Sequence, residues 1–478
     1  MSPRLAPLRT FFKAITSNGV GLLGAALTTA AAILFLSLFV IESLGFEGGP
    51  YLGILTFVVI PSLFVAGLLL IPVGMAWERR RARRAAARGE AAPGLPVVDL
   101  NVGRTRNIVL VFFAATVVNI VILAVATYKA VDVMDSTPFC GATCHSVMTP
   151  EYTTYQRSPH ARVPCVSCHI GPGAGWFVKS KLSGSWQLIS VNLKLYPKPI
   201  PVPVHNLRPA RETCEQCHWP TKFIGDRLKI ITHYQDDEAN TPQETVLLLR
   251  VGGLEGRTSR GIHWHVDPGV RIRYESDEKR ETIGTVELTR PDGTKETFTK
   301  PGAADGRPDA TGEAATWRTM DCIDCHNRPS HIYRMPGDEL DAALAVGRVD
   351  PKLPFIHREG MTLLQADYAS HAEARAKIAS GLADFYAKNG PAVPQERVAA
   401  AAKAIGDIYC VNVFPSMNIR WGTYPNFLGH VNAPGCFRCH DGEHADAAGT
   451  TIPNDCDTCH TVLAMDEENP EVLKTLQP

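Results

Sequence analysis

The sequence predicts three transmembrane helices followed by a loop-rich, mainly α domain with a small β insert. Three apolar segments, at residues 20–41, 52–77 and 108–127, are each long enough to supply the roughly 20 helical residues that a bilayer requires. All 13 cysteines follow the third segment, and most of them occur in closely spaced pairs. Between these pairs, one stretch alternates in the manner of a β-hairpin. The chain therefore divides into a membrane anchor, residues 1–127, and a cysteine-rich remainder.

Positive charges predict the orientation of the anchor. Arg4, Arg9 and Lys13 precede the first apolar segment without any acidic residue, and an arginine-rich run at 78–84 lies between the second and third segments. Lys and Arg collect in the cytoplasmic loops of membrane proteins. We therefore expect a protein of the bacterial inner membrane, with everything beyond residue 127 on the periplasmic side.

The charge of the remainder limits its partners. Beyond residue 127 the chain carries 43 acidic and 37 basic residues, so this part is net acidic. A nucleic-acid-binding domain is usually basic, and nucleic acid is therefore not an expected partner. The charge is compatible with docking of a basic periplasmic redox protein or a respiratory complex.

Five copies of the motif Cys-x-x-Cys-His follow the third apolar segment. A sixth copy is irregular, because three residues rather than two separate its cysteines. In chain order, the motif residues are Cys140, Cys144 and His145 in the irregular copy, followed by Cys165, Cys168 and His169; Cys214, Cys217 and His218; Cys322, Cys325 and His326; Cys436, Cys439 and His440; and Cys456, Cys459 and His460.

This motif is typical of covalent haem attachment. The two thiols form thioether bonds to the haem, and the adjacent histidine binds the iron. A zinc site, a redox-active cysteine pair or a disulfide framework does not require a histidine directly after each pair. We therefore expect about six molecules of haem c. The predicted fold class is a membrane-anchored multihaem cytochrome c with three transmembrane helices.

Each iron needs a second axial ligand, commonly His or Met. Histidines near the motifs are the first candidates: His160, His331, His430 and His444. His233, and one of His263 and His265, are candidates between the third and fourth motifs. Met148, three residues after His145, is a candidate ligand of the first haem, and packing against the porphyrin edge is the alternative. Cys410 has no partner if the other cysteines bind haem, and we expect it to be a buried thiol.

The motifs and the local patterns predict three regions after the anchor. Residues 128–220 form a core with the first three motifs, residues 221–312 form a β-containing insert, and residues 313–478 form a helical region with the last three motifs. In the insert, segments 285–290 and 295–300 flank an Asp-Gly turn, as in a hairpin, and 245–250 and 270–274 also resemble strands. Helical periodicity is clearest at 371–389 and 395–408.

Several local sequences resemble the NapC/NirT family of membrane-bound multihaem quinol dehydrogenases. They are Phe139-Cys140, Cys-His-x-x-Met at the first motif, Ser-Pro-His160, Cys165-Val-Ser-Cys-His-Ile-Gly-Pro-Gly, and Arg211-Glu-Thr-Cys-Glu-Gln-Cys-His-Trp-Pro. The close resemblance covers residues 128–220. A looser resemblance extends to the C-terminus: the chain as a whole is similar to inner-membrane multihaem cytochromes of metal-respiring bacteria, which attach further haems to this core. The chain departs from the usual family pattern of four haems and one span.

The resemblance implies oxidation of menaquinol or ubiquinol near the first haem and electron transfer to periplasmic acceptors. It also implies that Met148 can ligate that haem, with one residue of displacement from the family pattern. Lys179, Lys181 and Gln187 are the counterparts of residues that line the quinol pocket, and Asp132 and Asp135 are candidate proton acceptors. Contact of the two lysines with anionic lipid headgroups is the alternative interpretation.

Two other functions are compatible with the sequence. One is a periplasmic-side haem reductase of a small oxyanion, which needs an iron with an open coordination position. The other is a non-enzymatic subunit that anchors a larger respiratory complex to the membrane and transfers electrons within it. The chain has more histidines outside the motifs than it has motifs, which favours fully ligated irons and electron transfer.

Overall fold

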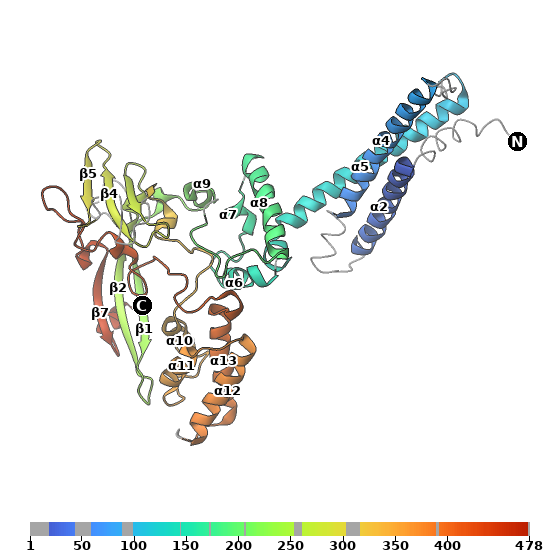
Figure 1. The fold of residues 1–478 in the computed structure, drawn as a ribbon. Helices are drawn as coiled ribbons and strands as arrows, with labels where there is room; N and C mark the ends of the chain where they lie inside the picture. Colours follow the sequence, from blue (N-terminus) through green and yellow to red (C-terminus); the bar gives the residue numbers. More distant parts are fainter. Residues whose placement is uncertain are drawn as a thin grey trace. The chain divides into compact units, whose positions relative to one another are not determined.

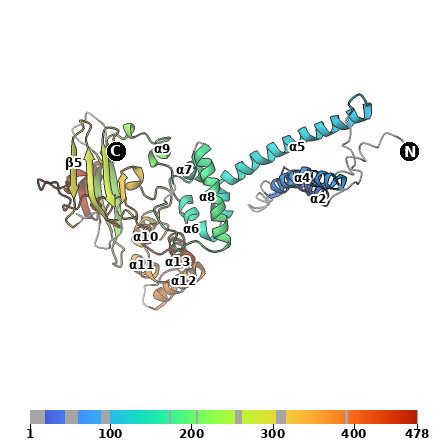
Figure 2. The same ribbon diagram turned by 45° about the horizontal axis from the view of Figure 1, so that its top comes forward.

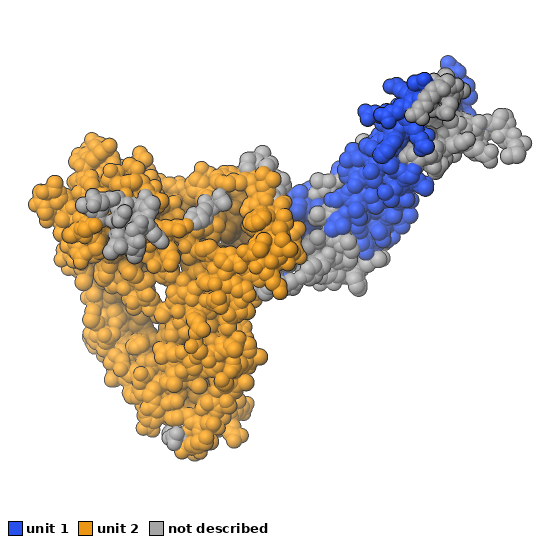
Figure 3. Space-filling view, viewed as in Figure 1, with its two compact units in different colours: residues 1–144 blue, residues 145–478 orange. Residues whose placement is uncertain are grey.

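The computed structural model describes residues 19–43, 59–87, 99–143, 145–171, 174–204, 207–252, 261–302, 316–388 and 392–476. The chain divides into two compact units, residues 1–144 and residues 145–478. Figure 1 shows their helices and strands, and Figure 3 colours the two units separately. Each unit is described by itself below.

Unit 1 contains the three predicted membrane helices. They are α2 (Gly19–Ser43), α4 (Ile60–Ala86) and α5 (Gly103–Asp135), and the described part of each is long and apolar enough to cross a membrane. The three predicted spans are thus confirmed as helices, although residues 52–58 of the second lie outside the described residues. Helix α5 continues beyond the predicted end at residue 127, because its apolar periodicity runs on to Met134. The described part of the chain therefore supports membrane anchoring.

Small residues allow α2 and α4 to pack closely. A Cβ atom added at Gly24 would lie 2.8 Å from the carbonyl oxygen of Gly67, and one added at Gly67 would lie 2.5 Å from Oγ1 of Thr28. The Thr28 hydroxyl donates a hydrogen bond to the carbonyl of Gly24, one turn earlier in the helix. Such close backbone approach at glycine is the usual basis of helix association in lipid, where apolar side chains gain nothing by leaving the solvent.

Unit 2 begins with four helices. They are α6 (His145–Gln156), α7 (Cys165–His169), α8 (Ala174–Asn192) and α9 (Ala210–Cys214). Helix α7 is the first regular motif, and α9 ends at the first cysteine of the next one. Helices α6, α7 and α8 lie together at one end of unit 2, and the strands lie at the other end (Figures 1 and 2).

Unit 2 contains two antiparallel sheets in its described part. The first has the strand order β1-β2-β7, with β1 (Asp226–Tyr234), β2 (Pro242–Arg250) and β7 (His460–Glu467). The second has the order β5-β4-β3-β6, with β3 (Arg271–Ser276), β4 (Ile283–Thr289), β5 (Lys295–Thr299) and β6 (Thr316–Thr319). Strands β6 and β7 lie outside the predicted insert, in the region predicted to be helical. Both are added to a sheet edge by pairing with strands that are distant in sequence.

The predicted hairpin is present. Strands β4 and β5 pair antiparallel, and the N–H of Gly293 donates to the carbonyl of Arg290 at 2.9 Å within the turn. Gly293 has φ +85°, in the left-handed region that favours glycine.

Gly293→Ala is therefore expected to destabilise unit 2 by about 1 kcal/mol, because a Cβ atom is strained at this φ. Thermal unfolding of the purified protein, followed by circular dichroism, measures the effect. Gly337→Ala is the matched control, because Gly337 lies in α10 without a positive φ and its added Cβ atom would meet only Met361, at 4.0 Å. Equal unfolding temperatures for the two variants would contradict the prediction.

Helices α10 to α13 form an apolar core of their own. They are α10 (Pro336–Ala345), α11 (Ile356–Gln365), α12 (His371–Lys388) and α13 (Gln395–Asn412). Helices α12 and α13 correspond to the two segments predicted to be helical, 371–389 and 395–408. Leu340, Ile356, Ile378 and Ile405 are fully buried in this core. No Cys-x-x-Cys-His motif lies between residues 336 and 412. The helical bundle thus has a core built from ordinary apolar side chains.

Candidate haem-binding site

The five regular motifs each fold into one helical turn. The second motif is α7, and the third begins at the last residue of α9. The other three begin in the 3₁₀ turns η6 (Cys322–Asp324), η8 (Gly435–Arg438) and η9 (Cys456–Thr458). The N–H of the second cysteine donates to the carbonyl of the first at 3.1 Å in the third motif, 3.3 Å in the fifth and 3.2 Å in the sixth. Residues three apart in such a turn lie on the same side. Each pair can therefore offer both thiols to one planar group.

Each histidine of these five motifs faces a second histidine from elsewhere in the chain. The pairs, with the distances between ring centres, are His169 and His331 (6.2 Å), His218 and His160 (6.0 Å), His326 and His263 (6.3 Å), His440 and His265 (5.8 Å), and His460 and His430 (6.2 Å). An imidazole nitrogen lies about 2 Å from a metal that it binds, and its ring centre about 1 Å further, so two rings on opposite sides of one iron have centres about 6 Å apart. The paired histidines fit a haem between them.

Backbone carbonyls orient four of the second histidines. In each case Nδ1 of the histidine lies within hydrogen-bond distance of one carbonyl oxygen. The four contacts are His160 with Pro329 (3.2 Å), His263 with Val251 (2.8 Å), His265 with Ile262 (2.7 Å) and His331 with Glu151 (2.9 Å). A carbonyl can only accept, so Nδ1 must carry the proton in each ring. Nε2 then keeps the lone pair that binds a metal, an arrangement typical of histidine ligands. Burial also lowers the pKa of His265, which favours the neutral ring.

The structure thus brings four of the predicted second ligands, His160, His263, His331 and His430, opposite motif histidines. It also places His265 opposite His440, although only one of His263 and His265 was expected to serve. Both lie in the 3₁₀ turn η5 (Ile262–Val266), where residues two apart point in different directions. The His-x-His spacing at 263–265 was the signal in the sequence that one short turn can serve two motifs.

Consecutive motifs contact each other in the order of the sequence. Helix α7 lies against α9, and α9 lies against η6, which joins the second, third and fourth motifs. Nη2 of Arg438 in the fifth motif donates to the carbonyl of Asp324 in the fourth, at 2.5 Å. The ring of Phe437, also in the fifth motif, stacks on His430 with ring centres 4.3 Å apart, and His430 faces the sixth motif. Five attachment sites therefore form an unbroken series.

Other chemistries of paired cysteines do not fit this geometry. The described cysteines form no disulfide bond with one another. Within the described ranges, no three His, Cys, Asp or Glu side chains converge in a way that could hold a metal ion, as a structural zinc site requires. Each regular motif instead combines two thiols with a histidine that faces a second imidazole.

Comparisons with known proteins show which family the chain belongs to. Residues 103–196 match the N-terminal region of the NapC/NirT cytochrome c family. The chain is 41% identical to the cytochrome c-type protein ImcH of Geobacter sulfurreducens over 460 residues, which are 95% of this chain and 89% of that protein. The chain belongs to the NapC/NirT cytochrome c family. It is also 32% identical to the cytochrome c-type protein NrfH of Wolinella succinogenes over 112 residues, 23% of this chain and 62% of that protein. No solved structure matches the chain.

This NapC/NirT cytochrome is therefore a membrane-anchored protein with covalently bound haem c. Its first motif is described only in part. Cys140 lies in the short π-helix η3 (Phe139–Thr143), whereas Cys144 and the side chain of His145 lie outside the described residues. Met148 is half-buried in α6. Its role as a ligand of the first haem stays a prediction.

Two histidines predicted as ligands have other partners in this cytochrome. His444 is fully buried, with Nδ1 2.9 Å from Oδ1 of Asp441 and Nε2 3.2 Å from the carbonyl oxygen of Ile283. Nδ1 of His233 lies 2.6 Å from Oδ2 of Asp341, and its ring faces His357 rather than a motif histidine. Because both nitrogens of His444 are engaged, and because no described motif lies beside His233, we assign neither residue to a haem. Among the described ring contacts, neither residue meets a motif histidine.

His357 in α11 is held by two carboxylates. Nδ1 lies 2.8 Å from Oδ1 of Asp236, and Nε2 lies 3.2 Å from Oδ1 of Asp341, which also contacts His233. Burial alone would lower the pKa of His357, but the nearby carboxylates of Asp341 and Asp236 outweigh burial and raise the pKa.

A raised histidine pKa stabilises the fold fully below the ordinary value of about 6.5, and this contribution is lost as the pH rises through the pKa of the folded protein. His357→Gln is therefore expected to lower the unfolding temperature more at pH 6 than at pH 9. Thermal unfolding at both pH values measures the difference. An equal loss at both would contradict the ion-pair role of His357.

The residues predicted to form a quinol pocket are only partly described. Lys179 and Gln187 lie in α8 and are exposed, with Nζ of Lys179 4.8 Å from the ring centre of Trp176 and Nε2 of Gln187 3.3 Å from Oγ of Ser183. The side chain of Lys181 lies outside the described residues. Positions 179 and 181 are two apart and so occupy different faces of the helix. Asp135 is the last residue of α5 in unit 1.

Proposed function

We propose that this cytochrome oxidises a membrane quinol and passes the electrons through six haems to an acceptor on the periplasmic side. The observation that carries the proposal is the opposed histidine at each of the five regular motifs. A haem iron with both axial positions filled accepts and releases single electrons without binding a substrate. This arrangement favours electron transfer over reduction of a small oxyanion, which needs an open position.

The contacts between motifs support conduction along the chain. The third and fourth motifs are joined through α9 and η6, and the fourth and fifth through Arg438. The first motif begins at Cys140, five residues after Asp135 ends the membrane helix α5. The series of attachment sites therefore starts at the membrane by connectivity of the chain and leads away from it in sequence order.

Oxidation of a quinol releases two electrons and two protons, so the site needs a proton acceptor near the end of a membrane helix. Asp132 and Asp135 meet this requirement by their position in the last turn of α5. Asp132 is exposed, and its Oδ2 lies 3.6 Å from Nζ of Lys129. Lys179, Lys181 and Gln187 are the candidate groups that bind the quinol oxygens, as the family resemblance implies.

Reduction of the purified holoprotein by menadiol tests the proposal. The haem absorbance is expected to change from oxidised to reduced in detergent or nanodiscs, and Lys179→Ala is expected to raise the menadiol concentration required severalfold. Lys388→Ala in α12 is the matched control, because Lys388 is exposed and its Nζ contacts only Asp384 among the ion pairs described here. Failure of menadiol to reduce a protein that dithionite reduces fully would overturn the quinol proposal.

A further inference from the structure

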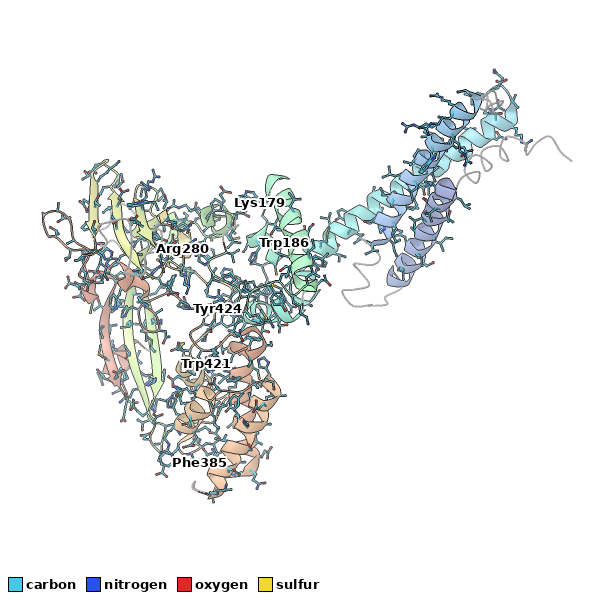
Figure 4. All side chains as sticks on the ribbon, in the orientation of Figure 1. Lys179, Trp186, Arg280, Phe385, Trp421 and Tyr424 are labelled. Atoms are coloured by element: carbon cyan, nitrogen blue, oxygen red, sulfur yellow. The ribbon has the colours of Figure 1, made fainter. Side chains whose placement is uncertain are left out.

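Helix α8 presents an apolar stripe to the outside of unit 2. Leu182, Trp186, Ile189 and Leu193 are spaced by four, three and four residues, so they lie along one face of this helical segment. Their exposed fractions are 70%, 59%, 49% and 65%. Figure 4 labels Trp186 on this helix, together with Lys179 near its beginning.

Other described residues of α8 are turned toward unit 2. Ser180, Ser183 and Ser190 are half-buried, and Val191 packs against an apolar cluster of unit 2 that contains Val147. A surface helix of a soluble domain normally turns its apolar face inward. Helix α8 instead leaves its row of large apolar side chains exposed, and a contiguous exposed apolar surface of this kind marks an interaction site.

The chain segment that contains α8 carries basic residues and no acidic ones. No acidic residue occurs from Tyr152 to Arg211, although the part of the chain beyond residue 127 is net acidic. The same segment contains eight basic residues. Three of them, Arg157, Arg208 and Arg211, form ion pairs with glutamates outside the segment. The other five are Arg162, Lys179, Lys181, Lys194 and Lys198. Trp176, Trp186 and Tyr196 also fall within the segment. Basic residues and amphipathic aromatic rings beside exposed aliphatic residues are typical of segments that lie at a membrane surface.

We propose that α8 is an interfacial helix, which inserts Leu182, Trp186, Ile189 and Leu193 into the surface of the bilayer and binds anionic phospholipid through the neighbouring basic residues. Charge complementarity selects this occupant. Anionic lipid neutralises the basic segment, whereas a second copy of the chain would bring two basic segments together. The three membrane helices keep the protein at a bilayer, so the surface that α8 needs is always available.

The proposal does not depend on quinol oxidation. If Lys179 binds lipid headgroups, the menadiol test above can fail while lipid contact remains. If Lys179 binds quinol, the stripe of Leu182, Trp186, Ile189 and Leu193 can still insert into the surface of the bilayer. The two assignments are therefore separable by experiment.

Photolabelling of the full-length holoprotein in vesicles tests the contact. The vesicles contain phosphatidylglycerol with a diazirine in the acyl chain, and labelled peptides are identified by mass spectrometry. We expect label in α2, α4 and α5, which are the internal positive controls, and also in α8. Helix α12, whose outer face is exposed, is the negative control in the same unit and is expected to carry none. Label in the three membrane helices but not in α8 would overturn the proposal.

Two further comparisons sharpen the result. The double variant Leu182→Ser/Trp186→Ser is expected to lose α8 labelling severalfold while haem content and the labelling of α5 stay unchanged. Val346→Ser is the matched control, because Val346 is 78% exposed but lies at the end of α10. Vesicles of phosphatidylcholine with the same diazirine chain are expected to label α8 less than phosphatidylglycerol does. Equal labelling in both lipids would overturn the assignment of anionic phospholipid.

Discussion

Replacing His331 with alanine is expected to remove one axial ligand and make one haem high-spin, while the other four haems with opposed histidines stay low-spin. The ring of His331 lies 6.2 Å from that of His169 in the second motif, and its Nδ1 is held by the carbonyl of Glu151. Without His331 the iron at this site keeps one histidine and an open position. Electron paramagnetic resonance of the oxidised protein measures the change, and the pyridine haemochrome assay is expected to show unchanged haem content.

Two other histidines provide matched controls. His444→Ala and His233→Ala are expected to leave the spin states of the wild-type protein unchanged, because neither residue faces a motif histidine in the described ring contacts. His263→Ala and His265→Ala are each expected to give one high-spin haem, and the double variant two, because the two rings face His326 and His440 separately. A high-spin signal from His444→Ala, or none from His331→Ala, would show that the assigned pairs are wrong.

The haem-attachment residues are predictable from sequence because the motif is local. Cys322, Cys325 and His326 lie within five residues, and one helical turn fixes their relation. The second ligands are not local. His331 follows the fourth motif in sequence but faces the second, and His430 precedes the fifth but faces the sixth. Only the folded chain reveals these pairings, because nothing in the local pattern specifies which motif a distant histidine will meet.

The same distinction holds for the fold. The hairpin of β4 and β5 and the helices α12 and α13 were predictable, because turn residues and helical periodicity are properties of adjacent residues. Strand β1 mixes charged and apolar residues and is stabilised only by its pairing with β2. Strand β7 begins at His460, directly at the end of a haem motif, and pairs with β2 from the far end of the chain. Its sequence alone does not predict a strand, because the strand is stabilised by its pairing with β2.

Replacing Asp324 with asparagine is expected to cause a large loss of stability. Asp324 lies in the fourth motif and is 1% exposed. Its Oδ1 accepts hydrogen bonds from Oη of Tyr274 at 2.5 Å and from Nε of Arg318 at 2.8 Å, and lies 3.6 Å from Nη1 of Arg280. Its Oδ2 accepts from the N–H of Asp321, which closes the turn that carries the motif.

The Asp324→Asn variant keeps the shape of the side chain but removes the negative charge between two arginines. Breaking a buried ion pair on one side leaves an uncompensated charge, which typically costs about 3–5 kcal/mol. Asparagine retains one acceptor oxygen, so we expect a loss near the lower end, about 3 kcal/mol. Asp384→Asn is the matched control, because Asp384 is also paired with a base, Lys388, but both side chains are more than two-thirds exposed.

Thermal unfolding of the holoprotein, followed by circular dichroism, measures both variants. Asp384→Asn is expected to unfold at the same temperature as the wild-type protein, since exposed ion pairs contribute little to the free energy of unfolding. Asp324→Asn is expected to unfold several degrees lower and to attach less haem at Cys322 and Cys325, because the same carboxylate shapes their turn. The carbonyl of Asp324 also accepts the hydrogen bond from Arg438, so the loss should extend to the fifth motif. An Asp324→Asn protein with wild-type stability and full haem content would show that this carboxylate does not hold the two motifs together.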